Sequence, residues 1–394
     1  MKDAELLIKS LEQVSPGEVA ADLQAHDQTY HIFFQCEDET LTNNLEAWLC
    51  FSIRPSMTDM NAIRADGPVS QRMLESIPTI QDIYTTWDPK LSRLEIRGAQ
   101  PVVRRPGSEG RVGCFFSGGV DSWYTFLKHQ DEITDLIFIH GVDIRFWQTS
   151  LYERTLATIQ SIADEYGKNL VVVKTNLRTF SDHRMTYTSI IGPALASVGH
   201  TLSDHFRKIY IAATHTYAEV IPPGSHPLVD PRFSSEALEF VHDGCEADRI
   251  AKTARIAKSG TALKTLRVCW ENPDQVYNCG KCEKCLRTMI GLQIVGALEQ
   301  CTTFNEPLNL SRVARMPIPT ISARELVKQT LKYLETNPNN RRLKSAIRWA
   351  LIRPRWIDVI TKRYITPKKK QIRNQHPEFY SMVKRMRKKL KFKP

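Results

Sequence analysis

Between residues 111 and 214, short apolar runs alternate with segments long enough to be helices. The expected strands are residues 111–116, 136–142, 169–175 and 208–214. The expected helices are residues 120–129, 150–167 and 191–206. Strands that are buried on both faces read as continuous apolar runs, and parallel strands need a crossover between them. The pattern therefore predicts an α/β domain built on a doubly wound parallel sheet.

The first of these strands runs into Ser-Gly-Gly-Val-Asp-Ser. A junction of strand, glycine and helix presents unpaired backbone N–H groups and binds anions readily. Glycines allow a phosphate to approach the backbone, and the two serines add hydroxyl donors. Asp121 fits beside phosphates if it holds a divalent cation or pairs with a base. The predicted nucleotide-binding residues are Ser117, Gly118, Gly119, Val120, Asp121 and Ser122. The alternative is an ordinary turn with an Asp or Ser helix cap.

Four of the nine cysteines are clustered, with nine residues in the first gap and two in each of the others. They are Cys269, Cys279, Cys282 and Cys285. Two-residue gaps let neighbouring thiolates bind one ion, and four sulfur ligands predict a closed, structural Zn²⁺ site. An iron–sulfur cluster is the alternative, because four cysteines also hold those.

Both motifs resemble one group of enzymes. Ser117–Ser122 after the first strand of a parallel sheet is similar to the signature of the PP-loop ATP pyrophosphatases. The segment from Cys269 through "CGKCEKCLR" to Arg287 is similar to that of the 7-cyano-7-deazaguanine synthases, with one spacing a residue shorter. The resemblance covers roughly residues 111–295.

The resemblance implies a ligase that forms a C–N bond. The glycine loop would hold the pyrophosphate end of ATP with Mg²⁺, and ATP would be cleaved to AMP and pyrophosphate. An acceptor carboxylate or carbonyl oxygen would be adenylated and then attacked by ammonia or an amine. Two alternatives are a tRNA-modifying enzyme, by thiolation or base conversion, and a non-catalytic nucleotide-binding module.

Three segments depart from the synthase pattern. "GVDIRF" (141–146) replaces a Tyr-Gly-Gln motif, and residues 214–233 only partly match the stretch that shapes the deazaguanine pocket. Ala247 stands where the family has a lysine, for which Arg249 or Lys252 can substitute. We therefore expect an acceptor pocket that differs from that of the deazaguanine enzymes.

Four further residues follow the expected strands, at the edge where such sheets bind ligands. Asp143 and Asn176 are predicted to contact the nucleotide, with a helix cap as the alternative for Asp143. Arg178 is predicted to meet a phosphate or carboxylate, and a solvated loop arginine is the alternative. His215 is predicted to act as an acid or base, with a structural role as the alternative.

The remaining chain is expected to form separate parts. Residues 1–105 read as a small α+β domain, with strands at 29–38, 46–54 and 91–99, joined by a linker at 101–111. Residues 106–310 form the nucleotide domain, and 311–394 a helical basic extension. Its helix at 322–335 has a predicted capping box, Ser322 and Glu325.

Charge is unevenly distributed. Residues 341–394 carry 19 Lys and Arg against two acidic residues, a net of +17, whereas the rest of the chain has a net of −6. This tail is predicted to contact RNA or an anionic membrane, with a solvated tail as the alternative. Its candidate apolar stripe is Phe379, Met382, Met386 and Leu390. No signal peptide or membrane-spanning run is evident, which predicts a cytoplasmic protein, and a homodimer is compatible with the sequence.

Overall fold

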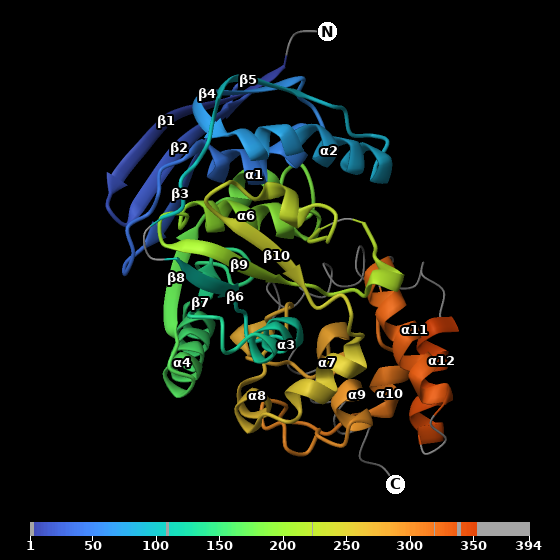
Figure 1. Ribbon diagram of the computed structural model, residues 1–394. Coiled ribbons are helices and arrows are strands. Elements are labelled where there is room, and N and C mark those ends of the chain that lie inside the picture. The colour runs from blue at the N-terminus through green and yellow to red at the C-terminus, as the bar shows by residue number, and fades with distance from the viewer. Residues whose placement is uncertain (1–3, 108–109, 223, 319, 337–339, 353–394) are drawn as a thin grey trace, which may run out of the picture. The chain divides into compact units, whose positions relative to one another are not determined.

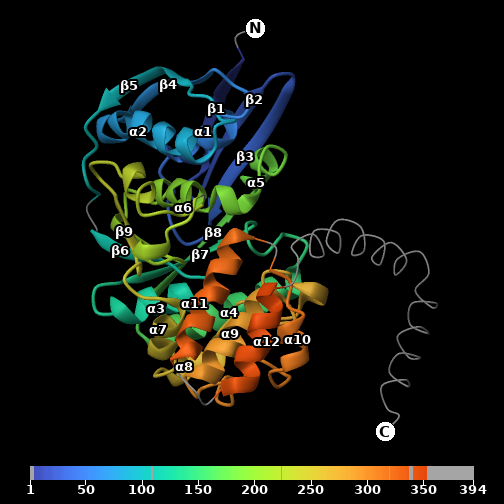
Figure 2. The same cartoon turned by 90° about the vertical axis from the view of Figure 1, so that its right-hand side faces the viewer.

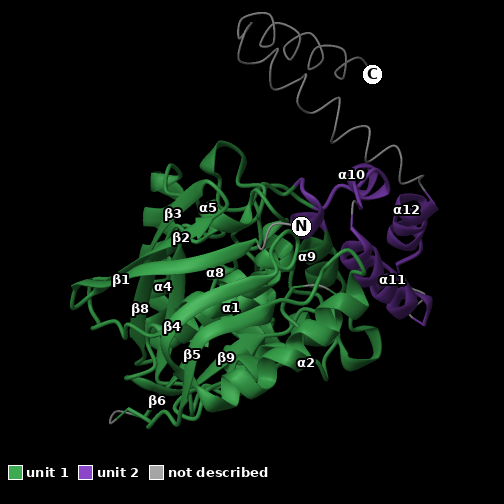
Figure 3. Cartoon of the chain, turned by 90° about the horizontal axis from the view of Figure 1, so that it is seen from above, with its two compact units in different colours: residues 1–280, 287–307 green, residues 281–286, 308–394 purple. Residues whose placement is uncertain are grey.

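The computed structural model describes residues 4–352 except 108–109, 223, 319 and 337–339. Contacts divide the chain into two compact units, coloured separately in Figure 3. The first comprises residues 1–280 and 287–307, and the second comprises residues 281–286 and 308–394.

The first unit is built on one ten-stranded, mostly parallel sheet, which confirms the predicted α/β class. The strand order is β10-β9-β6-β7-β8-β3-β2-β1-β4-β5. The strands are β1 (Glu5–Ser15), β2 (Glu18–Ala25), β3 (Gln28–Cys36), β4 (Ala62–Ser70), β5 (Glu95–Val102), β6 (Arg111–Phe115), β7 (Asp135–His140), β8 (Asn169–Thr175), β9 (Phe206–Ala212) and β10 (Glu239–Asp243).

The order of the parallel strands creates a crevice beside β6. Cys114 of β6 pairs with Leu136 of β7 on one side and with Tyr210 of β9 on the other, both in parallel register. The chain runs outwards from β6 to β7 and β8, then returns to add β9 and β10 on the opposite side. Open α/β sheets bind ligands where the strand order reverses, outside the carboxyl ends of the strands. In this sheet that point lies between β6 and β9.

The N-terminal strands continue the same sheet. β1, β2 and β3 form an antiparallel meander, and β3 pairs antiparallel with β8, with Phe34 opposite Thr175. Residues 1–105 and the parallel strands therefore share one sheet within one compact unit. Whether residues 1–105 also fold alone stays a prediction.

Helices cover both faces of the parallel strands. α6 lies on one face, and α3, α4 and α7 lie on the other (Figure 1). α1 packs against α6, so that this pair lies between the N-terminal strands and the parallel strands (Figure 2). The helices of this region are α1 (Leu45–Ser56), α2 (Gln71–Trp87), α3 (Val120–Lys128), α4 (Thr149–Glu165), α5 (Arg178–Ser181), α6 (Ile191–His200), α7 (Arg249–Ile256), α8 (Gly260–Thr265) and α9 (Glu283–Ile294).

The prediction of a strand at 46–54 is wrong, because this segment lies inside helix α1. All twelve residues of α1 are buried, including Glu46 and Arg54, so the helix has no exposed polar face that would give its sequence a helical periodicity. Such a segment cannot be assigned from its pattern alone. The helix begins at Asn44, whose side chain accepts a hydrogen bond from the backbone N–H of Ala47.

The second unit contains helices α10 (Leu310–Ala314), α11 (Ile321–Glu335) and α12 (Arg341–Ile352). The predicted capping box of α11 is wrong, because Thr320 is the N-cap and accepts from the N–H of Ala323, which places Ser322 inside the helix. The predicted stripe at residues 379–390 lies outside the described residues. Among the helices that the structure describes, none is long and apolar enough to cross a bilayer.

Candidate functional site

The Ser-Gly-Gly turn connects the carboxyl end of β6 to the first turn of α3. Gly118 has a φ of +73°, a conformation that side chains with a Cβ rarely adopt. Gly119 is the N-cap of α3, and it makes no side-chain cap bond to the first turn of the helix. The Gly118 carbonyl accepts a hydrogen bond of 2.8 Å from the backbone N–H of Arg267, which fixes the turn from outside. A strand, a glycine turn and a helix N-terminus thus meet as expected, and anion binding there stays a prediction.

Asp121 lies in the first turn of α3, beside two buried cations from α7. Its Oδ2 accepts a 3.0 Å bond from Arg249, and its Oδ1 lies 3.6 Å from the Lys252 ammonium. The Thr214 hydroxyl, which follows β9, lies 3.4 Å from the same carboxylate. Residues after β6, after β9 and on α7 therefore meet at the crevice between β6 and β9.

Burial perturbs the ionisable groups around Asp121. Lys252 is fully buried, its ammonium donates to the Ala213 carbonyl at 2.6 Å, and burial lowers its pKa while Asp121 opposes that shift. Burial and the nearby Arg249 lower the pKa of His215 to about 4. His215 is therefore neutral at pH 7 and suited to accept a hydrogen bond, and so low a pKa makes it a weak base.

Asp143 is held next to the glycine turn. It follows β7, and its carboxylate pairs at 2.8 Å with the guanidinium of Arg267, whose backbone fixes Gly118. Arg267 is 3% exposed and also donates to the Asn272 side chain at 3.0 Å. The sequence analysis missed Arg267, for which the only signal is a basic residue inside the apolar run that leads to Cys269.

Two predicted residues make contacts that hold the fold. The Asn176 amide accepts from the Phe33 N–H and donates to the His31 carbonyl, which ties the loop after β8 to β3. Arg178 donates to the Val142 carbonyl at 2.8 Å and lies over the ring of Tyr187. Asp121 is near enough to His215 to interact with it electrostatically, whereas Arg178 supports the loop that carries Asp143.

The four clustered cysteines converge. The sulfur atoms of Cys269, Cys279, Cys282 and Cys285 all lie within 4.8 Å of one another. A tetrahedron with Zn–S bonds of about 2.3 Å has sulfur–sulfur edges of about 3.8 Å, so this set could hold a metal ion such as zinc. Asn278 positions one ligand, because its side-chain oxygen accepts the backbone N–H groups of Val268 and Cys269. The four thiols have no carboxylate or imidazole among them, as expected for a closed site.

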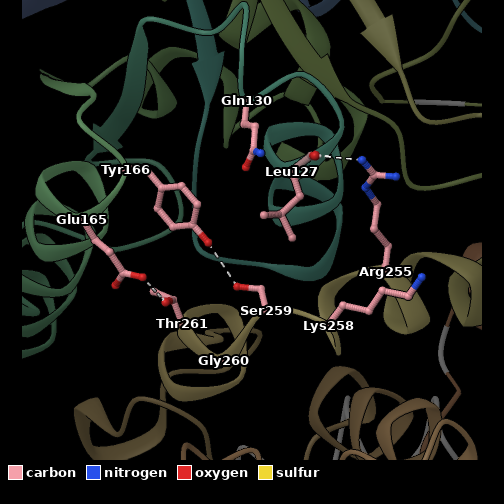
Figure 4. Close-up of a pocket in the computed structure, with 9 residues that line it drawn as sticks. All are labelled: Leu127, Gln130, Glu165, Tyr166, Arg255, Lys258, Ser259, Gly260 and Thr261. Atoms are coloured by element: carbon pink, nitrogen blue, oxygen red, sulfur yellow. Dashed lines mark hydrogen bonds between the residues drawn. The ribbon is translucent and has the colours of Figure 1, made fainter.

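A separate open cavity of about 560 Å³ lies at the far ends of α3 and α4 (Figure 4). Its wall includes Arg255, which donates to the Leu127 carbonyl, and Tyr166, which contacts the Ser259 hydroxyl. None of the predicted site residues lines it. We therefore place the candidate site at the glycine turn and not at this cavity.

Comparison with known proteins adds no further constraint, since no family model, curated protein or solved structure matches this chain.

Proposed function

We propose that this protein is an ATP-dependent ligase of the PP-loop type, which adenylates a carboxylate or carbonyl acceptor and releases pyrophosphate. Ammonia or an amine then displaces AMP and forms a C–N bond. The observation that supports this best is the glycine turn at the reversal of strand order, with Asp121 beside Arg249 and Lys252. Enzymes of this sheet class bind nucleotides at that position.

The charges around the turn favour a polyphosphate ligand. Arg249, Lys252 and Arg267 are each at most 5% exposed. Buried cations are costly unless they are paired, and their carboxylate partners here are Asp121 and Asp143. Arriving phosphate oxygens would give these cations further partners, and an accompanying Mg²⁺ would neutralise charge and engage Asp121.

The proposed roles follow from where each group lies. N–H groups at the start of α3 bind the pyrophosphate portion, and Arg249 and Lys252 stabilise the charge that develops as it leaves. Because His215 is neutral at pH 7, it is suited to accept a hydrogen bond from the attacking amine and to orient it. The rate gain comes from positioning and charge stabilisation.

Pyrophosphate release tests this proposal. The full chain is incubated with Mg-ATP, ammonium and a panel of aromatic and heterocyclic carboxylic acids, and acceptor-dependent pyrophosphate is measured. Asp121→Asn should lower the rate at least a hundredfold, whereas Asp131→Asn, an exposed aspartate in a turn, should retain it. Equal rates in the wild type and Asp121→Asn would contradict the mechanism.

The metal at the cysteine cluster is proposed to be a structural Zn²⁺. All four ligands are sulfur, so a single ion would have no open coordination position for substrate. In this proposal the zinc ion stabilises the segment between Arg267 and α9. Arg267, at the start of this segment, fixes the glycine turn through its backbone N–H.

The basic tail supports a second proposal, that the acceptor or a partner is RNA. α12 brings Arg341, Arg342, Lys344 and Arg348 into a single helix. This basic charge continues to the chain's end in the sequence. Phosphate contacts from such a segment give tight and salt-dependent binding.

A further inference from the structure

The open cavity of about 560 Å³ lies where α3, α4 and α7 end and α8 begins (Figure 4). Sites for small molecules have volumes of about 300–1,000 Å³ and join apolar surface to a few polar groups that orient the ligand. Leu127 and the ring of Tyr166 supply apolar surface to this wall, and Gln130 adds a polar group. The cavity therefore has the size and the mixed lining of a site for a small molecule.

The cavity carries opposite charges on its two sides. Glu165 lies on one side, and Arg255 and Lys258 lie on the other (Figure 4). None of these three makes an ion pair within the part of the chain that the structure describes. A ligand that carries both an anionic and a cationic group would pair all of them.

Neutral neighbours hold two of these charged side chains in place. Arg255 donates to the Leu127 carbonyl at 2.8 Å, and Glu165 accepts a hydrogen bond from the Thr261 hydroxyl. These contacts restrain the side chains but leave their charges without a counter-ion. Side chains that are already restrained lose less conformational entropy when a ligand binds.

The position of Glu165 favours a ligand cation next to it. Glu165 is the last residue of α4, and the last turn of that helix contains no basic residue. The carboxyl end of a helix carries partial negative charge, which favours a cation there and disfavours a carboxylate. A ligand ammonium beside Glu165 would offset both negative charges. On the other side, Arg255 and Lys258 suit a ligand carboxylate.

We propose that this cavity binds a free L-amino acid with an apolar side chain. The carboxylate of the amino acid binds Arg255 and Lys258, and its ammonium binds Glu165. Its side chain packs against Leu127 and the ring of Tyr166. The inference does not depend on the proposed function, because no residue proposed to hold the nucleotide lines the cavity.

A bound amino acid would contact two helices that also carry the candidate site. α3 carries Asp121 in its first turn and Leu127 near its end, and α7 carries Arg249 and Arg255. A ligand that bridges the ends of these helices should stabilise both of them.

Isothermal titration calorimetry of the full chain without nucleotide tests the ligand class. L-Phenylalanine and L-leucine should each bind with saturable heat at one site. Phenylpropionate, which lacks the ammonium, and phenethylamine, which lacks the carboxylate, should bind at least tenfold more weakly than L-phenylalanine. No binding by either amino acid, or equal affinity for either analogue, would overturn the proposal.

Charge-removing variants test the location of the site. Lys258→Gln and Glu165→Gln should each weaken L-phenylalanine binding about tenfold. Lys264→Gln and Glu153→Gln are the matched controls and should bind normally, because both residues are exposed on α8 and α4 but do not line the cavity. Unchanged affinity in either cavity variant would overturn the assignment.

Hydrogen–deuterium exchange tests the contact with the two helices. Saturating L-phenylalanine should slow exchange of the α3 and α7 amides at least twofold and leave those of α2, which does not line the cavity, unchanged. Equal exchange of α3 and α7 with and without L-phenylalanine would overturn the proposal, whether or not the protein releases pyrophosphate from ATP.

Discussion

Nδ1 of His242, on β10, lies 2.8 Å from Oδ2 of the buried Asp230, and this His242–Asp230 pair should make stability fall as the pH rises above neutrality. The pKa of His242 is about 9 in the folded protein, against about 6.5 for a free histidine. Raising the pKa from about 6.5 to about 9 corresponds to about 3 kcal/mol. Because the folded pKa is raised, this stabilisation is fully present below about pH 6.5 and is lost as the pH passes through 9. The His242 side chain is 3% exposed, so solvent screening reduces this stabilisation only slightly.

Urea denaturation of the wild type and His242→Gln at pH 6 and pH 9.5 measures the stabilisation that protonated His242 contributes. The difference in unfolding free energy between the two proteins should shrink by about 3 kcal/mol between these pH values, since packing losses are equal at both. His31→Gln is the matched control, because His31 pairs with Asp22 at 3.0 Å but its side chain is 66% exposed. A change below about 1 kcal/mol for His242→Gln would refute the reasoning.

Three further predictions concern the metal, the turn and the tail. Cys282→Ser should lower bound zinc from about one ion per chain to below half by elemental analysis, whereas visible absorption of the wild type near 400 nm would indicate iron–sulfur instead. Gly118→Ala should cost about 1–2 kcal/mol of stability and weaken ATP binding at least tenfold by calorimetry. Gly167→Ala is the control: Gly167 has a φ of +60° and open space around it, so this change should lower stability without weakening ATP binding. Removing residues 353–394 should weaken tRNA binding at least tenfold at low salt in a filter assay, and unchanged affinity would contradict an RNA-binding tail.

The sequence predicted the parallel strands well because each is a short apolar run bounded by polar turns. The expected strand at 169–175 coincides with β8, and the expected helix start near Val120 coincides with α3. The glycine turn and the cysteine cluster could also be recognised from the sequence, because each is a local motif whose residue types are tied to one kind of geometry.

Residues that act across long sequence distances were harder to predict. Arg249 and Lys252 were expected only as substitutes for a family lysine, and their pairing with Asp121, more than a hundred residues away, was not foreseen. Arg267 reaches Asp143 over a similar span. Nothing local to a basic residue reveals which carboxylate it will meet. Asn176 was predicted to contact the nucleotide because it follows β8 at the edge where such sheets bind ligands. Its side chain instead makes hydrogen bonds to the backbone of the neighbouring strand β3.

The pairing of β3 with β8 has a consequence for aggregation. A strand at the edge of a sheet exposes N–H and C=O groups that can recruit a strand from another molecule. β3 occupies that edge of β8 over the register from Phe34 to Cys36, and Asn176 extends the contact by one residue beyond the strand. A shortened protein that begins near residue 106 would uncover the edge of β8, a strand rich in valine. The N-terminal strands therefore protect the parallel sheet from self-association as well as enlarging it.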